Sequence, residues 1–234
     1  MLSLALAGLA GFAGFSAAAA TPSQPPVVIE LFSSQACTYC PPADAFMAEL
    51  VKQQGVIGLT CHVDYFDVKK GSLAKRFCTR RQSDYVRRMK LSSNYTPQMV
   101  VNGHIDVIGY ETGKVSAAVL KARAEKILPL QITKKAENVY SFSLPSMHTG
   151  DDPARIWVAL FDKPHNVTVA EGGNAGKHIT YHNIVSGLMD LGPWDGAMAS
   201  RVVSPIMSAS QAGFAVLVQE EKSGNIIAAG AVYR

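Results

Sequence analysis

Residues 27–42 have the sequence VVIELFSSQACTYCPP, and the architecture of the chain can be worked out from this stretch. Its first six residues form an apolar run interrupted only by Glu30, which is typical of a strand buried on both faces. A polar loop follows and carries Cys37. Pro41 and Pro42 favour the first turn of a helix, where proline is tolerated. The stretch therefore predicts a buried strand, a loop that contains a C-x-x-C pair, and a helix.

The pattern continues through the first half of the chain. The sequence predicts a strand at 56–63, a basic helix at 72–90, a strand at Val100 and Val101, a partner strand at 105–108 and a helix at 112–127. Asn102-Gly103 between the last two strands is a strong hairpin signal. This order predicts a mixed sheet, with parallel strands joined by helical crossovers and an antiparallel hairpin at one edge.

The sequence pattern changes near residue 130. Short alternating or β-branched stretches follow, separated by Gly, Pro and Asp, at 130–144, 155–161, 178–185, 201–208 and 213–233. Residues 192–196 are expected to form a packed turn. The predicted fold class is α/β: a mixed sheet flanked by helices, followed by a smaller antiparallel β-rich unit over 130–234.

The N-terminal segment points to export. Residues 1–20 carry no charged side chain and end in the small-residue run SAAAA, which predicts a signal peptide cleaved before Thr21. An uncleaved membrane anchor is the alternative, because a span needs about 20 residues. We expect a periplasmic or secreted protein, in a compartment where disulfides persist, with membrane contact only if the segment is retained.

The length and charge of the chain limit the kinds of core and partner that we expect. The 234 residues are 48% hydrophobic and 17% charged, enough for a packed core. A net charge of +4 by itself favours neither nucleic acid nor membrane binding, so we expect no nucleic-acid partner.

The pair Cys37-Thr38-Tyr39-Cys40 carries the chemistry. Such a pair can be half a zinc site, a structural disulfide or a redox pair. Cys37 lies near a helix N-terminus, where the helix dipole and free N–H groups favour a thiolate. No second C-x-x-C completes a Cys₄ zinc site, and His178 and His182 share a strand face without an obvious third ligand. We therefore predict a redox pair, no metal and no cofactor.

This arrangement resembles the thioredoxin superfamily over residues 27–127. The resemblance rests on the C-x-x-C pair after a buried strand and on Thr96-Pro97 before a β-hairpin and a final helix. It implies a thioredoxin-like domain, with predicted bounds 21–129, in which Cys37 is the attacking thiolate and Cys40 the buried resolving thiol. It also implies a cis Pro97 that faces the pair and, with Thr96 and Tyr39, binds an extended substrate.

The chain is also similar, over nearly its whole length, to a family of secreted bacterial proteins of unassigned function. The similarity lies in residues 28–35 (VIELFSSQ), 40–45 (CPPADA), 62–65 (HVDY), 95–103 (YTPQMVVNG) and 191–196 (LGPWDG). This resemblance implies an exported protein and leaves its activity open.

Residues near the pair have candidate roles. Glu30 is either a proton relay for Cys40 or a carboxylate that emerges at the strand end. His62, Asp64 and Tyr65 close the second strand, at the sheet edge that also holds Cys37, so we expect them to line the substrate site. For His62, a structural hydrogen-bonding role is the alternative to a proton shuttle.

Two more features of the sequence each allow two interpretations. Cys61 lies about 7 Å before the end of its strand and Cys78 about 9 Å into its helix, so their depths permit a second disulfide. Two buried free thiols are the alternative. Residues 69–90 contain nine basic residues against one acid, Asp84, which indicates a solvated helix face or a docking surface for acidic partners.

The sequence predicts a thiol:disulfide oxidoreductase that acts on protein or small thiol and disulfide substrates through Cys37 and Cys40. A non-enzymatic binding protein is the alternative, with the pair fixing the loop or holding a soft ion such as Cu(I). In a third possibility the β-rich unit binds a partner and the redox pair is vestigial. The direction of electron flow stays open, because Thr38 and Tyr39 carry no charge.

Overall fold

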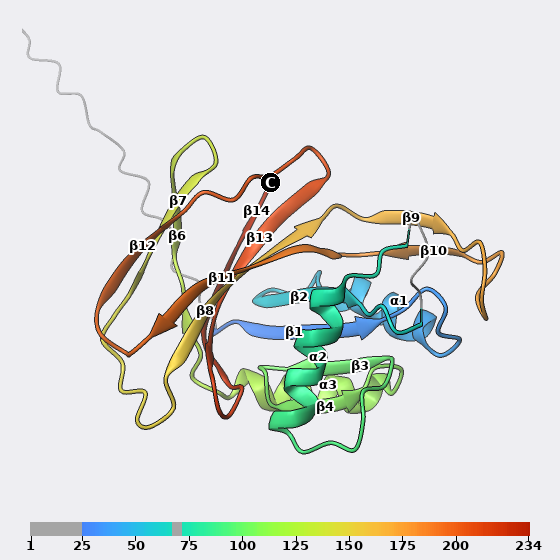
Figure 1. Cartoon of the computed structure of the whole chain (residues 1–234), viewed down its shortest axis with the longest axis horizontal. Coiled ribbons are helices and arrows are strands. Elements are labelled where there is room, and N and C mark those ends of the chain that lie inside the picture. The colour runs from blue at the N-terminus through green and yellow to red at the C-terminus, as the bar shows by residue number, and fades with distance from the viewer. Residues whose placement is uncertain (1–24, 67–71) are drawn as a thin grey trace, which may run out of the picture.

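The computed structural model describes residues 25–66 and 72–234. Within them the chain is a strand-rich, mixed α/β protein with few helices and several sheets (Figure 1). The predicted signal peptide, residues 1–20, lies outside the described residues.

The first half of the chain forms a four-stranded mixed sheet in the order β2-β1-β3-β4. Its strands are β1 (Val27–Ser33), β2 (Val56–His62), β3 (Gln98–Val101) and β4 (Ile105–Ile108). β1 pairs in parallel with β2 and antiparallel with β3. β3 and β4 form a hairpin through Asn102 (φ 47°) and Gly103 (φ 79°). The predicted mixed sheet, with an antiparallel hairpin at one edge, is confirmed.

Among the described residues, three helices pack around this sheet: α1 (Cys40–Leu50), α2 (Arg76–Arg88) and α3 (Thr112–Arg123). α1 and α3 share an apolar cluster with Ile29 and Leu31 of β1. The alternate residues Val28 and Phe32 belong to a cluster on the opposite face, together with Tyr85 of α2.

Two helices are shorter than the sequence predicts. α2 begins at Arg76 rather than at residue 72, because Lys75 is extended and its N–H donates to the His62 carbonyl. α3 ends at Arg123 rather than at residue 127, because the chain enters strand β5 (Leu128–Pro129), which pairs with a strand of the second half.

The second half of the chain contributes a five-stranded sheet, β11-β8-β13-β14-β5, a three-stranded sheet, β12-β7-β6, and the hairpin β9–β10. Its strands are β6 (Ile132–Ala136), β7 (Val139–Leu144), β8 (Ala154–Asp162), β9 (His165–Thr168), β10 (His178–Tyr181), β11 (Val185–Trp194), β12 (Ala199–Val203), β13 (Gln211–Glu220) and β14 (Ile226–Tyr233). As predicted, these strands pair antiparallel with one another.

One local prediction in this half is wrong. Residues 192–196 were expected in a packed turn, but residues 192–194 complete β11. The buried Trp194 pairs there with Ala154 of β8, after a shift in register between Asp190 and Pro193.

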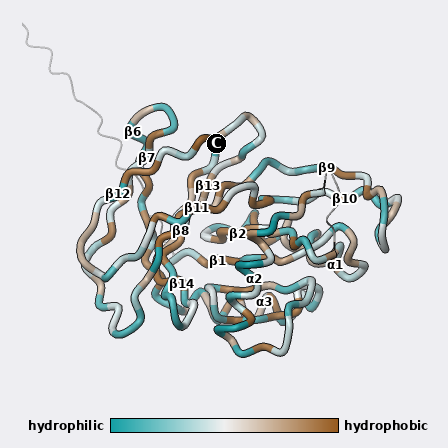
Figure 2. Tube along the Cα trace, in the orientation of Figure 1, coloured by the Kyte–Doolittle hydropathy of each residue, from teal (hydrophilic) through white to brown (hydrophobic). Residues whose placement is uncertain are grey.

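The five-stranded sheet is sandwiched between two apolar layers. Phe161 and Leu217 pack against β1, β2 and α2, whereas Phe214 and Val216 pack against the three-stranded sheet. Apolar residues accordingly follow β1 and the strands packed beside it, while the outer loops are mostly polar (Figure 2). The four-stranded sheet is thus buried partly by the second half of the same chain.

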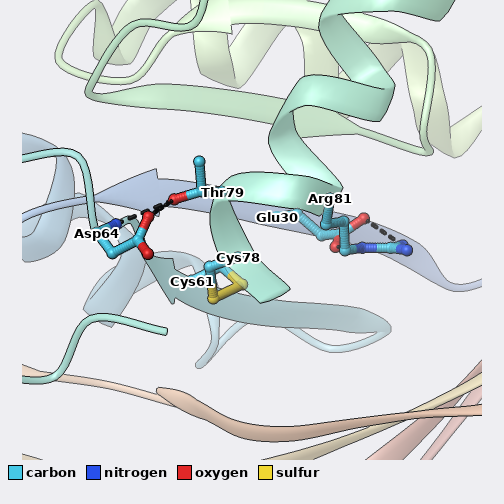
Figure 3. Close-up of a disulfide and its surroundings, with 6 residues drawn as sticks. All are labelled: Glu30, Cys61, Asp64, Cys78, Thr79 and Arg81. Carbon is cyan, nitrogen blue, oxygen red and sulfur yellow. Dashed lines mark hydrogen bonds and ion pairs between the residues drawn. A yellow bond between two sulfur atoms is a disulfide. The ribbon is translucent and has the colours of Figure 1, made fainter. Parts of the chain in front are cut away.

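A disulfide joins Cys61 of β2 to Cys78 of α2, with their Cα atoms 5.3 Å apart (Figure 3). It fixes α2 on the face of the sheet that the five-stranded sheet also covers. A disulfide of this kind is compatible with export. Within residues 25–66 and 72–234, no helix has the length and apolar character needed to cross a membrane.

Candidate functional site

Cys37 and Cys40 are free thiols at the junction of β1 and α1. Cys37 lies in the connecting turn, where its N–H donates to the Ser34 carbonyl and its own carbonyl accepts from the Cys40 N–H at 3.2 Å. Cys40 is the first residue of α1, and Pro41 and Pro42 occupy the first turn of that helix. Cys37 is 7% exposed and Cys40 is fully buried, so the more accessible thiol is that of Cys37.

The surroundings shift the pKa values of the two thiols in opposite directions. The hydrogen bond from Cys40 lowers the pKa of Cys37 to about 6 against the opposing effect of burial, with further contributions from Thr96 and from the N–H groups of Tyr39 and Cys40. Burial, followed by the hydrogen bond to Cys37, raises the pKa of the Cys40 thiol far above its ordinary range. At neutral pH the site therefore favours a thiolate at Cys37 and a neutral thiol at Cys40.

Thr96 and Pro97 lie directly against Cys37. The Thr96–Pro97 peptide bond is cis, and the Cys37 sulfur lies 3.7 Å from the Thr96 carbonyl oxygen. The buried Thr96 hydroxyl has no hydrogen-bond partner elsewhere among the described residues, which leaves it available to the Cys37 sulfur. The Pro97 carbonyl accepts from the N–H of Gly109 at 2.8 Å, which ties the segment to the end of β4.

Asp44 is a component of the site that the sequence reasoning missed. It lies one helical turn after Cys40, is 3% exposed, and accepts a hydrogen bond from the Ser33 hydroxyl at 2.8 Å. Its second carboxyl oxygen has no partner within the described residues. Burial, partly offset by the hydrogen bond from Ser33 and assisted by Cys37, raises the pKa of Asp44 to about 8. The i, i+4 spacing from Cys40 is the signal that could have revealed it.

Ser33 connects this carboxyl to the buried thiol. The Ser33 hydroxyl acts to lower the pKa of Cys40, against the larger effect of burial. It also donates to Asp44. The three groups thus form a short polar chain in an otherwise apolar interior.

Exposed aromatic rings surround the Cys37 turn. Tyr39 is 68% exposed and its ring centroid lies 6.0 Å from that of Tyr110. Tyr65 donates from its hydroxyl to Gln82 at 3.1 Å. Burial raises the pKa of the Tyr65 hydroxyl to about 12, with smaller effects of Cys40 and Cys37 in the same direction.

The structure does not bring Glu30 to the cysteines. Its carboxylate points to the opposite face of β1 from α1, where Arg81 donates to it from Nε and from Nη2, the latter at 2.9 Å (Figure 3). Tyr85 also donates to this carboxylate, and Gln219 of β13 binds both Arg81 and Tyr85. This contact set makes Glu30 part of a buried ion-pair network between the two halves of the chain.

His62 and Asp64 also have partners away from the thiols. His62 is buried, with its ring edge-on to Tyr181 at 4.7 Å between centroids. Burial lowers its pKa to about 3, with His165 acting in the same direction, so this ring is neutral. Asp64 accepts a hydrogen bond from Thr79 of α2 (Figure 3). Among the described residues, neither side chain hydrogen-bonds to Cys37 or Cys40.

The part of the chain that the structure describes contains no group of three or more His, Cys, Asp or Glu side chains that could hold a metal ion. His178, a candidate ligand in the sequence, instead lies 2.9 Å from the Thr168 hydroxyl across the β9–β10 hairpin.

Together, the fold and the site define a mixed α/β protein with an unbonded C-x-x-C pair beside a cis proline. The chain belongs to the DUF1223 family, described as proteins of unknown function, whose family model matches residues 28–219. No curated protein matches the sequence.

Solved structures that are similar to this chain include the following two. A protein from Agrobacterium tumefaciens is 27% identical with a TM-score of 0.76, and the match covers 91% of this chain and 96% of that one. HBP35 of Porphyromonas gingivalis is 15% identical with a TM-score of 0.64, over 90% of this chain and 75% of that one, and this likeness concerns the fold alone.

Proposed function

We propose that this chain is an exported, thioredoxin-like thiol:disulfide oxidoreductase that exchanges disulfides through Cys37 and Cys40. The observation that carries the proposal is the contrast between its two cysteine pairs. Cys61 and Cys78 are bonded to each other, whereas Cys37 and Cys40 are free thiols with oppositely shifted pKa values. A low-pKa thiol beside a protonated partner is the arrangement that disulfide exchange requires.

The topology around the pair supports the thioredoxin-like part of the proposal. The element order β1-α1-β2-α2-β3-β4-α3 is the one predicted from the sequence, and the sheet order β2-β1-β3-β4 places the antiparallel hairpin at one edge, as expected. The cis Thr96–Pro97 bond lies against Cys37, as expected for a proline that faces the redox pair.

The first chemical step uses the Cys37 thiolate. Its sulfur attacks one sulfur of a substrate disulfide, forming a mixed disulfide and releasing the other substrate sulfur as a thiolate, which takes a proton from water. The Cys40 thiol stabilises the thiolate most before the attack, and the Thr96 hydroxyl and the N–H groups of Tyr39 and Cys40 add to this effect. Tyr39, Tyr110 and Tyr65 supply apolar surface around the approaching substrate.

The second step needs a base for Cys40. The buried thiol must lose its proton before its sulfur can attack the Cys37 sulfur and close the Cys37–Cys40 disulfide. The substrate sulfur leaves as a thiolate, which takes a proton from water. Ser33 and the ionised form of Asp44, whose share grows as the pH approaches the Asp44 pKa of about 8, provide a route. The Cys40 proton passes to the Ser33 oxygen while the Ser33 proton moves to the Asp44 carboxylate. The pair is oxidised and the substrate disulfide is reduced; the same steps in reverse oxidise a substrate dithiol.

Trapping of the mixed disulfide tests the proposal. Cys40→Ser removes the resolving thiol, so the variant should accumulate a covalent adduct with glutathione disulfide or with a disulfide-containing peptide, detected by non-reducing mass spectrometry. Cys37→Ser should form no such adduct and should lose exchange activity. An equal adduct yield from both variants, or exchange activity retained in Cys37→Ser, would contradict the proposal.

A further inference from the structure

The tip of the β9–β10 hairpin lies on the loop that carries Cys37. The hairpin extends from β8 and β11 alongside β2, and β10 contacts α1 (Figure 1). At its tip, a Cβ atom built on Gly172 would lie 3.2 Å from the Ala36 Cβ. One built on Gly173 would lie 2.0 Å from the Thr38 methyl group. The two segments are therefore in close contact, and the tip has no room for side chains at these glycines.

Asn174 is the buried member of this tip. Residues 171–177 are exposed except for Asn174, which is 0% exposed. Its Nδ2 donates to the Gln35 carbonyl at 3.0 Å and to the Cys37 carbonyl at 2.7 Å, so both amide protons are used on the loop. Lys177 donates to the Asn174 Oδ1 at 2.9 Å.

The hairpin in turn holds Asn174 in place. The N–H of Gly176 donates to the Val169 carbonyl at 2.8 Å, and the N–H of Lys177 donates to the Asn174 carbonyl at 3.0 Å. The side chain is thus presented by a hydrogen-bonded turn, and its orientation is fixed from both ends. A residue held in this way can fix the conformation of the backbone that it binds.

We propose that Asn174 is a positioning residue of the thiol site, and that the hairpin tip holds the Cys37 turn in the conformation in which backbone N–H groups face the sulfur. This inference rests on the proposed redox function. Its physical basis is that the Cys37 carbonyl accepts from both Asn174 and the Cys40 N–H. Without Asn174, the backbone carbonyls of Gln35 and Cys37 keep, among the described residues, only the local hydrogen bond from the Cys40 N–H. The backbone N–H groups of the turn are then free to turn away from the sulfur.

The pH dependence of thiol reactivity tests the inference. We would measure, by stopped flow between pH 4 and pH 9, the reaction of the reduced full chain with the small disulfide 5,5′-dithiobis(2-nitrobenzoate). In Asn174→Ala the fast phase should be about fivefold slower at pH 5, well below the pKa of Cys37, which is the factor that one lost hydrogen bond confers, and it should recover at pH 9. The midpoint of the pH profile should move upward accordingly. Asn166→Ala removes an exposed amide from the same hairpin and should leave the profile unchanged.

A steric variant provides a second test if Asn174→Ala fails to fold. Gly173→Ala adds a methyl group against the Thr38 methyl and should push the tip from the loop, with the same upward shift in the profile. The double variant Gly173→Ala/Thr38→Ser lacks the Thr38 methyl group with which the new methyl group at position 173 would clash. Its pH profile should therefore return toward that of Thr38→Ser alone.

The outcomes separate this inference from the proposed function. If Cys37→Ser keeps the fast phase, the redox proposal fails whatever Asn174→Ala does. If Cys37→Ser loses that phase while folded Asn174→Ala and Gly173→Ala variants superimpose on the wild-type profile, the positioning role is overturned and the redox proposal stands.

Discussion

The Asp44 carboxyl is buried one helical turn beyond Cys40, and burial raises its pKa from 3.8 to about 8. Between these two values the unfolded chain has lost the proton while the native protein keeps it, so this group makes the protein less stable as the pH rises. Asp44→Asn should therefore raise the free energy of unfolding at pH 8, by an amount of the order of a few kcal/mol, and leave it unchanged below about pH 4. Chemical denaturation at several pH values measures this difference.

The same substitution should slow exchange, because the amide cannot accept the Cys40 proton. Glu49→Gln is a matched control, since it alters an exposed carboxylate of the same helix. A stability gain of equal size at pH 4 and pH 8 would contradict a protonated Asp44. Exchange kinetics equal to those of the wild type would contradict its role as the base.

Sequence patterns predict some residues of the site but not others. Cys37 and Cys40 lie within one short motif, and Thr96-Pro97 stands directly before a hairpin signal, so local patterns suffice to find them. Asp44 could have been found from helical spacing. Asn174 lies 137 residues from Cys37 and carries no local signal, because a contact of this kind depends on the path of a distant hairpin.

At the scale of elements, α2 is held on the sheet by the Cys61–Cys78 disulfide and by the Arg81–Glu30 ion pair. Both members of that pair are buried, and Gln219 links Arg81 to β13. The sequence placed Glu30 in a buried strand but could not identify its partner, since pairing a charge on β1 with α2 and β13 requires the tertiary arrangement. Burial of a charge nevertheless predicts that some partner must exist.

Arg81→Ala should lower the free energy of unfolding by about 3–5 kcal/mol, because it leaves the Glu30 carboxylate buried without its cationic partner. Combining Arg81→Met with Glu30→Gln should recover part of this loss. Arg80→Ala is the control, because Arg80 is exposed on the same helix and its loss should change stability by less than about 0.5 kcal/mol. Equal stabilities of Arg81→Ala and Arg80→Ala in urea would contradict a structural role for the pair.

At the scale of the whole molecule, the two halves of the chain share one core. The sequence predicted the mixed sheet and the later β-rich half, because periodicity and turn signals are local. It did not predict that the five-stranded sheet covers the second face of β1 and β2, since an apolar strand does not specify what packs on it. The β9–β10 hairpin extends from β8 and β11 of this sheet, so the same packing brings the hairpin tip to the Cys37 turn.

The reduction potential of the Cys37–Cys40 pair tests the redox assignment most directly. The lowered pKa of Cys37 stabilises the dithiol form at neutral pH, so equilibration with glutathione at pH 7 should give a potential less negative than about −270 mV, the value of thioredoxin. Thiol alkylation and mass spectrometry quantify the dithiol and disulfide forms of the Cys37–Cys40 pair, and they distinguish these forms from those of the Cys61–Cys78 pair. A potential below about −300 mV would mark the Cys37–Cys40 bond as structural and would contradict the proposed function.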